Sequence, residues 1–136
     1  MEGDTVENLD DLIDFKTGRQ KRLIYSDAEI YDQEMEKIFG RSWLFLAHEC
    51  QLEKPGDFIR TYMGEDEVLV VRQKDNGLKA FLNTCTHRGN RLCKADHGNS
   101  KSFVCNYHGW SFSYNGELTG VPLEEAAYQN NLDKSK

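Results

Sequence analysis

The sequence predicts a mainly β chain, made of small antiparallel sheets that form a sandwich or small barrel and preceded by one short α-helix. Three short apolar runs without a helical period, at residues 43–46, 58–62 and 68–71, are typical of strands. Asn76-Gly77 and Asn115-Gly116 are tight-turn signals, and each lies between two strand-like runs. Repeated short strands joined by tight turns favour an all-β domain.

The single predicted helix occupies residues 26–40. Ser26 stands three residues before Glu29, which is the spacing of a capping box, and apolar residues follow at helical intervals. Gly40 is placed to end the helix, because glycine readily adopts the conformation that terminates helices. The chain before the helix is acidic up to its first base, Lys16. The expected segments are an acidic arm at 1–25, the helix at 26–40, a β domain at 41–120 and a connecting segment at 121–136.

The composition excludes several classes of protein. The chain has 136 residues, enough for one ordinary domain, and 23 acidic against 17 basic side chains give a net charge of −6. A negative chain repels phosphate backbones, so nucleic acid is not expected as a partner. No apolar run approaches the roughly 20 residues of a membrane-spanning helix, and the first residues lack the basic and apolar regions of a secretory signal. We therefore predict a cytoplasmic protein that has no membrane partner.

Two cysteine and histidine pairs form the strongest functional signal. Four cysteines in a cytoplasmic chain indicate metal or redox chemistry ahead of disulfides. Cys85 precedes His87, and Cys105 precedes His108, with 17 residues between His87 and Cys105. Each pair follows an apolar strand-like run and is therefore expected in a loop. Two such loops, each with one sulfur and one nitrogen ligand, predict a four-ligand metal site.

The residues that follow each histidine support this site. Arg88-Gly89 follows the first histidine and Gly109-Trp110 the second. Glycine lets the backbone turn sharply and approach a bound group closely. Trp110 offers an apolar wall. Cys50 and Cys93 are expected to be ordinary packing or surface thiols. His48 and His97 are expected to be structural or solvated side chains.

The pattern C-x-H-x17-C-x2-H, with Arg88-Gly89 and Gly109-Trp110 after its histidines, resembles the Rieske [2Fe–2S] motif of ring-hydroxylating oxygenases. Residues 22–125 are similar to the amino-terminal part of naphthalene- and biphenyl-type dioxygenase α subunits. The segments that carry this similarity are 25–29, 41–46, 54–57 and 115–118. The resemblance implies the Rieske fold, in which Cys85 and Cys105 would bind one iron and His87 and His108 the other.

The resemblance also implies a function and a set of partners. Such a domain would take electrons from a ferredoxin, which an NAD(P)H-dependent reductase supplies, and pass them to a mononuclear Fe(II) that inserts O2 into an aromatic hydrocarbon. An oxygenase β subunit and other α subunits are implied as partners. The mononuclear site of the family, two histidines and a carboxylate, lies in a later catalytic domain, so we expect no catalytic residue in this chain. Residues 121–136 would begin the connection to that domain.

One departure from respiratory Rieske proteins bears on the potential. Respiratory Rieske proteins carry one extra cysteine in each loop, and these two cysteines form a disulfide. Asn90 and Tyr107 stand at those positions here. We therefore expect a potential in the lower half of the Rieske range, which runs from about −150 to +300 mV.

Four basic side chains lie around the motif: Arg88, Arg91, Lys94 and Lys101. They would form a positive rim that docks an acidic electron donor. The alternative is an ordinary solvated loop.

Two alternatives to the oxygenase domain remain open at this point. A free-standing Rieske ferredoxin would carry the same cluster, but it would not need the predicted helix or the acidic arm. A structural zinc module would use the same Cys2His2 ligand types. Gly109-Trp110 and the wider resemblance weigh against zinc.

Overall fold

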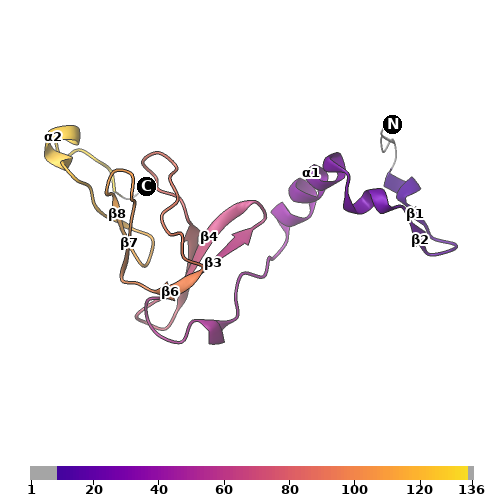
Figure 1. Cartoon of the computed structure of the whole chain (residues 1–136), viewed down its shortest axis with the longest axis horizontal. Helices are drawn as coiled ribbons and strands as arrows, with labels where there is room; N and C mark the ends of the chain where they lie inside the picture. The colour runs from indigo at the N-terminus through magenta and orange to yellow at the C-terminus, as the bar shows by residue number, and fades with distance from the viewer. Residues whose placement is uncertain (1–8, 135–136) are drawn as a thin grey trace. The chain divides into compact units, whose positions relative to one another are not determined.

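The computed structural model describes residues 9–134, which divide into two compact units (Figure 1). The first unit extends to Trp43 and the second begins at Leu44. Nearly all strand structure lies in the second unit, and the longest helix lies in the first. The prediction of a mainly β chain with one short helix ahead of its larger sheets is confirmed. Within residues 9–134, no helix has the length and apolar character needed to cross a membrane.

The first unit consists of short turns and one regular helix. From residue 9 the predicted acidic arm contains two helical turns and a minimal hairpin; residues 1–8 lie outside the described part of the chain. Among residues 10–43, the buried apolar side chains are Leu12 and Ile30. Its elements are η1 (Leu9–Leu12), β1 (Ile13–Asp14), β2 (Arg19–Gln20), η2 (Arg22–Tyr25), α1 (Ala28–Lys37) and η3 (Phe39–Arg41).

Both predicted ends of helix α1 need correction. Asp27, and not Ser26, is the N-cap: its backbone is extended and its carboxylate accepts a hydrogen bond from the Ile30 N–H at 3.0 Å. At the other end, α1 stops at Lys37, before Gly40. Gly40 lies inside the 3-10 turn η3 and does not adopt the left-handed conformation of a terminating glycine.

The second unit contains two antiparallel sheets. A four-stranded sheet has the order β5-β4-β3-β6, and a three-stranded sheet has the order β7-β8-β9. Sequence neighbours pair directly except at β6, which lies beside β3 (Figure 1). The elements are η4 (Glu49–Gln51), β3 (Asp57–Met63), β4 (Asp66–Arg72), β5 (Leu78–Leu82), β6 (His97–Asn99), β7 (Ser102–Val104), β8 (Ser111–Ser113), β9 (Leu118–Gly120) and α2 (Glu124–Tyr128).

The two predicted Asn-Gly turns are confirmed. Asn76 has a positive φ of 63° in the turn that joins β4 to β5. Gly116 has a φ of 89° in the turn between β8 and β9. A Cβ at Gly116 would also lie 3.1 Å from the Phe81 ring, so the backbone approaches the other sheet closely there.

The predicted strand at residues 43–46 is wrong. This segment forms no strand, and Trp43 is fully exposed while Phe45 is 79% exposed. Apolar content alone predicted the strand, and apolar content does not reveal whether a neighbouring strand is available for pairing.

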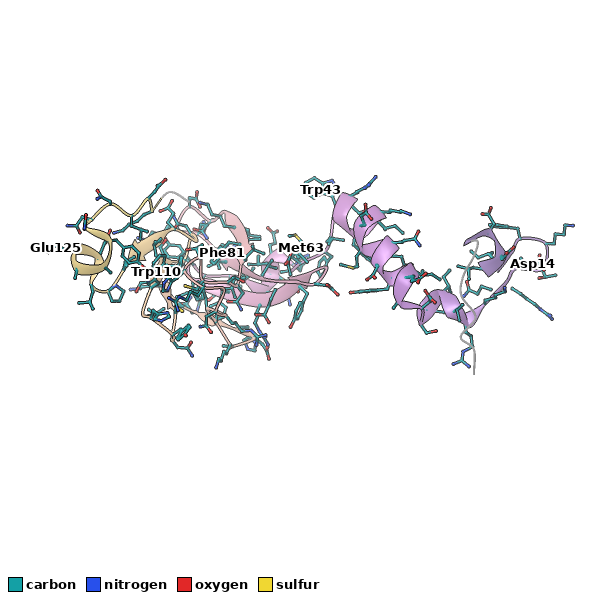
Figure 2. The ribbon with its side chains drawn as sticks, turned by 90° about the horizontal axis from the view of Figure 1, so that it is seen from above. Asp14, Trp43, Met63, Phe81, Trp110 and Glu125 are labelled. Atoms are coloured by element: carbon teal, nitrogen blue, oxygen red, sulfur yellow. The ribbon has the colours of Figure 1, made fainter. Side chains whose placement is uncertain are left out.

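Two small cores hold the second unit together. One contains Phe58, Leu69 and Phe103, and the rings of Phe58 and Phe103 meet edge to face at 5.3 Å. The other contains the two buried cysteines together with Trp110, Phe112 and Leu118. In Figure 2, the labelled Phe81 packs against the first core and the labelled Trp110 belongs to the second. Leu92 packs against both cores.

The segment after residue 120 packs on the second core. Val121, Tyr128 and Leu132 are partly buried against it. Sequence reasoning assigned residues 121–136 to a connection toward a further domain. Whatever follows it in a longer chain, the described part of this segment covers the cysteine-bearing core.

Candidate metal centre

The two cysteine loops repeat one backbone turn. The Gly89 N–H donates to the carbonyl of Cys85 at 2.8 Å, and the Gly109 N–H donates to that of Cys105 at 2.9 Å. In each loop the cysteine N–H donates to the carbonyl five residues later, at 2.7 Å to Asn90 and 2.8 Å to Trp110. Equivalent hydrogen bonds therefore fix both cysteines.

Both turns depend on a glycine in the left-handed region. Gly89 has a φ of 72° and Gly109 a φ of 75°. L-residues with a side chain adopt this conformation only at an energetic cost. At Gly109 a Cβ would also lie 3.0 Å from Cγ of Pro122. The glycines that follow the two histidines in the sequence are thus required by the turn itself.

The two thiols are buried and meet one another. Cys85 is 1% exposed and Cys105 is 2% exposed, and their side chains share a hydrogen bond. The backbone N–H groups of the residues two and three positions after each cysteine donate to its sulfur: His87 and Arg88 at Cys85, and Tyr107 and His108 at Cys105. Such a ring of donors stabilises a thiolate, which is the form that binds metal.

The two cysteines differ in their acidity. Burial raises the pKa of Cys85. Burial also acts to raise the pKa of Cys105, but hydrogen bonds from the Tyr107 backbone and the Asn90 side chain outweigh this effect, so the pKa of Cys105 is lowered. Cys105 is therefore the thiol of the pair that ionises first.

The two histidine rings also form a pair. The ring centroids of His87 and His108 lie 4.6 Å apart. His87 stacks on Trp110 with centroids 4.7 Å apart and planes 9° from parallel, which makes Trp110 the apolar wall that the sequence predicts. Burial, followed by the nearby His108 and Arg88, lowers the pKa of His87 and keeps its ring neutral, as a ligand must be.

The two ring nitrogens of His87 have different surroundings. Nε2 lies 3.5 Å from the hydroxyl of Tyr128. Nδ1 is buried and has no hydrogen-bond partner within residues 9–134. Buried nitrogens are normally partnered, so the unpartnered Nδ1 of His87 is suited to bind a metal.

The four predicted ligands therefore come together as a thiol pair and an imidazole pair. No position within the described chain gathers three or more His, Cys, Asp or Glu side chains around one ion. A single tetrahedral zinc would require four converging ligands, whereas a sulfide-bridged two-iron cluster takes two protein ligands at each iron. The donors and their grouping fit a [2Fe–2S] cluster.

One of the four bases of the predicted positive rim is already paired with a carboxylate. Arg88, Lys94 and Lys101 are exposed. The Nε of Arg91 instead forms an ion pair with Oε2 of Glu67 at 2.8 Å, so much of its charge is compensated. Three bases thus remain available on the loops for an acidic partner.

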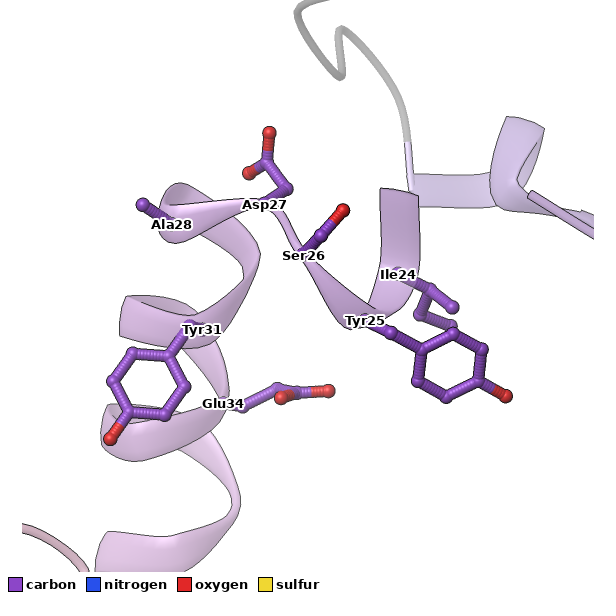
Figure 3. Close-up of a pocket in the computed structure, with 7 residues that line it drawn as sticks. All are labelled: Ile24, Tyr25, Ser26, Asp27, Ala28, Tyr31 and Glu34. Carbon is purple, nitrogen blue, oxygen red and sulfur yellow. The ribbon is translucent and has the colours of Figure 1, made fainter. Parts of the chain in front are cut away.

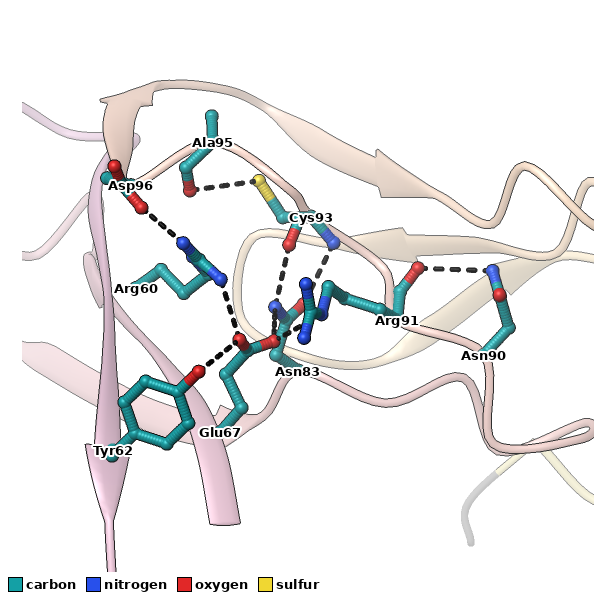
Figure 4. Close-up of polar contacts among 9 residues, drawn as sticks. All are labelled: Arg60, Tyr62, Glu67, Asn83, Asn90, Arg91, Cys93, Ala95 and Asp96. Atoms are coloured by element: carbon teal, nitrogen blue, oxygen red, sulfur yellow. Dashed lines mark hydrogen bonds and ion pairs between the residues drawn. The ribbon is translucent and has the colours of Figure 1, made fainter. Parts of the chain in front are cut away.

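Glu67 was missed by sequence reasoning and holds the first loop in place (Figure 4). Its side chain is 11% exposed. One carboxylate oxygen accepts hydrogen bonds from Arg60 at 2.7 Å and Tyr62 at 3.2 Å. The other accepts from Asn83 at 2.7 Å and pairs with Arg91. Glu67 is thereby bound to a residue on either side of Cys85 and His87.

Asn83 continues this network. It is 1% exposed and exchanges two hydrogen bonds with the backbone of Cys93, at 2.8 and 2.7 Å. The loop that carries the first ligand pair is therefore closed at its base by side-chain bonds. Arg60 also pairs with Asp96 beyond the loop (Figure 4).

We expect this network to make stability depend on pH in the acid range. Burial acts to raise the pKa of Glu67, but hydrogen bonds from Asn83, Arg60 and Tyr62 and the charge of Arg91 lower it below its ordinary 4.5. Because the folded pKa is the lower one, its stabilising effect is complete above pH 4.5 and is lost as pH falls through the folded pKa. Urea unfolding of the wild type and Glu67→Gln across pH 7 to 3 should show a difference that shrinks with acidification. A constant difference would contradict the role given to the carboxylate.

The other cysteines and histidines lie away from the four ligands. Exposed His48 caps η4, where its ring accepts a hydrogen bond from the Cys50 N–H. Cys50 is exposed, and Cys93 packs against the Phe103 core. His97 is exposed on β6. Each of these side chains has a structural or solvated position, as expected.

A hollow in the first unit is separate from this site. It lies between η2 and the start of α1 and includes Tyr25, Tyr31 and Glu34 in its lining (Figure 3). No predicted ligand lines it.

Known proteins match both the sequence and the structure. A Rieske [2Fe–2S] domain matches residues 42–131. Biphenyl 2,3-dioxygenase subunit alpha of Rhodococcus jostii is 54% identical over 121 residues, which are 89% of this chain and 26% of that protein. Benzene 1,2-dioxygenase subunit alpha of Pseudomonas putida is 52% identical over 120 residues, 88% of this chain and 27% of that protein. The chain spans about a quarter of the length of these relatives.

Solved structures give the same result. Naphthalene 1,2-dioxygenase with indole bound in the active site has a TM-score of 0.82 and 47% identity, over 90% of this chain and 28% of that one. A quaternary ammonium Rieske monooxygenase has a TM-score of 0.72 and 31% identity, over 83% of this chain and 31% of that one. The resemblance to dioxygenase α subunits predicted from the sequence is confirmed, and the chain belongs to the Rieske [2Fe–2S] domain family.

Proposed function

We propose that this chain is the electron-transfer portion of the terminal oxygenase α subunit of an aromatic-ring-hydroxylating dioxygenase. The observation that carries the proposal is the pairing of two buried thiols with two neighbouring imidazoles on twin turns. Cys85 and Cys105 hold one iron, and His87 and His108 hold the other. When bound, the [2Fe–2S] cluster supplies a one-electron redox couple whose potential is raised by its histidine ligands.

The protein's own residues prepare the site for this task. Hydrogen bonds at Cys105 lower the pKa of its thiol and favour the thiolate, and the lowered pKa of His87 keeps its ring neutral; these are the ionisation states that ligands need. Trp110 fixes the orientation of His87 by stacking. His108 is exposed, so it is the ligand through which the site faces its surroundings.

The partners and substrate class belong to the same proposal. The electrons come from a ferredoxin and its NAD(P)H-dependent reductase and pass to a mononuclear Fe(II) in a catalytic domain supplied by the longer protein. An oxygenase β subunit and other α subunits complete the enzyme, which works in the cytoplasm. The relatives' names support aromatic hydrocarbons as substrates. Arg88, Lys94 and Lys101 form the surface that docks an acidic ferredoxin.

A kinetic experiment separates this proposal from a free-standing Rieske ferredoxin. The oxidised chain, with its cluster in place, is mixed with a reduced ferredoxin from a dioxygenase system, and the cluster absorbance is followed. We expect rapid reduction that slows as salt is added, because charge steers the encounter. If dithionite reduces the cluster but no ferredoxin does, the proposed electron donor is wrong. A reduced chain that drives turnover by a separate terminal oxygenase would favour the free-standing carrier.

A further inference from the structure

Asn90 belongs to the first loop, but its side chain reaches the second. Its Nδ2 donates to Sγ of Cys105 at 3.4 Å and to Oδ1 of Asn106 at 2.8 Å, and it lies 3.1 Å from the carbonyl of Arg91. The backbone carbonyl of Arg91 can only accept, which identifies the nitrogen of the amide as the atom that faces these neighbours. The side chain is half-buried, so water competes only partly for these bonds.

The repeated turn shows what is special about Asn90. Asn90 and Trp110 occupy the same place in their loops, because the carbonyl of each accepts the hydrogen bond from the cysteine N–H. Their side chains serve different partners. Trp110 stacks on the imidazole of His87, whereas Asn90 donates to the thiol of Cys105.

We propose that Asn90 is a positioning residue that raises the reduction potential of the cluster through its hydrogen bond to the Cys105 sulfur. The inference rests on the proposed function, because it requires Cys105 to be a ligand. Reduction adds negative charge to the cluster, and a hydrogen bond donated to a ligand sulfur stabilises that charge. Removing the donor therefore makes reduction harder.

Asn90 also joins the two loops mechanically. Its carbonyl accepts from the Cys85 N–H, while its amide contacts Asn106 in the other loop. Asn106 is exposed and accepts a hydrogen bond from Asn90. Substitutions at 90 and 106 can therefore separate the bond to sulfur from the link between the loops.

The test compares three variants of the chain with its cluster assembled. Asn90→Leu removes the donor, Asn90→Asp keeps the shape but replaces the nitrogen by an oxygen, and Asn106→Ala removes the Asn90–Asn106 contact while it leaves the bond to the Cys105 sulfur in place. Potentials are measured by titration followed by electron paramagnetic resonance, after iron and sulfide analysis of each sample. We expect a shift to more negative potential in Asn90→Leu, a larger one in Asn90→Asp because of its charge, and little change in Asn106→Ala.

The outcomes distinguish this inference from the proposed function. Unchanged potentials in both Asn90 variants with full clusters, or an equal shift in Asn106→Ala, would overturn the role of the bond to sulfur. Loss of the cluster from both Asn90 variants, with retention in Asn106→Ala, would assign Asn90 to loop structure and also overturn it. A wild-type chain without a [2Fe–2S] cluster would instead defeat the proposed function.

Discussion

Cys105→Ser should abolish the cluster, with iron and acid-labile sulfide falling from about two of each per chain to near zero. The serine hydroxyl is far less acidic than the thiol whose pKa this site lowers, and it is a poor ligand for iron. Loss of one ligand also leaves Cys85 buried without its partner in the core. Because metal binding and folding are coupled, we further expect easier unfolding of the second unit.

Cys50→Ser is the matched control for this substitution. Cys50 is an exposed thiol that lies outside both cores, so the control removes a cysteine without touching the site. It should keep full iron and sulfide. If Cys105→Ser retains as much iron and sulfide as Cys50→Ser, the assignment of Cys105 as a ligand is wrong.

Glu67→Ala should destabilise the second unit by about 3 kcal/mol, because it removes several hydrogen bonds to one largely buried charge. Arg60 would keep Asp96 as its partner, but Arg91 and Asn83 would lose their shared anchor. The loop that carries Cys85 and His87 would then be held less firmly. Denaturant unfolding should show the lower stability, and loss of iron to a chelator should be faster.

Glu53→Ala provides the comparison, since Glu53 is an exposed carboxylate of the same unit. Its stability should change by less than about 0.5 kcal/mol. Equal effects of the two substitutions would show that the Glu67 network contributes no more than surface charge.

Local signals in the sequence predicted the two loops that carry the cysteine and histidine pairs well. The motif places one Cys and one His in each loop, and Gly89 and Gly109 stand where the turn requires a positive φ. The Asn-Gly turns were readable for the same reason, because a few adjacent residues determine them. Asp27 and Ser26 are both good capping residues, and only the structure decides between such neighbours.

Contacts between distant residues could not be predicted in this way. Glu67 lies 16 residues from Asn83, and Asn90 lies 15 residues from Cys105. These contacts form only when strands pair and the two loops meet. Strand β6 is polar and short, so it gives no apolar signal although it completes a sheet. The apolar run at 43–46 shows the opposite error, an apolar signal without a strand.

The most direct test of the central claim is iron and sulfide analysis of the anaerobically purified chain, combined with an electron paramagnetic resonance spectrum after reduction by dithionite. We expect about two irons and two sulfides per chain and a Rieske-type signal with a low average g value. A colourless protein that contains about one zinc and gives no signal would contradict the cluster and make the four ligands a structural metal site.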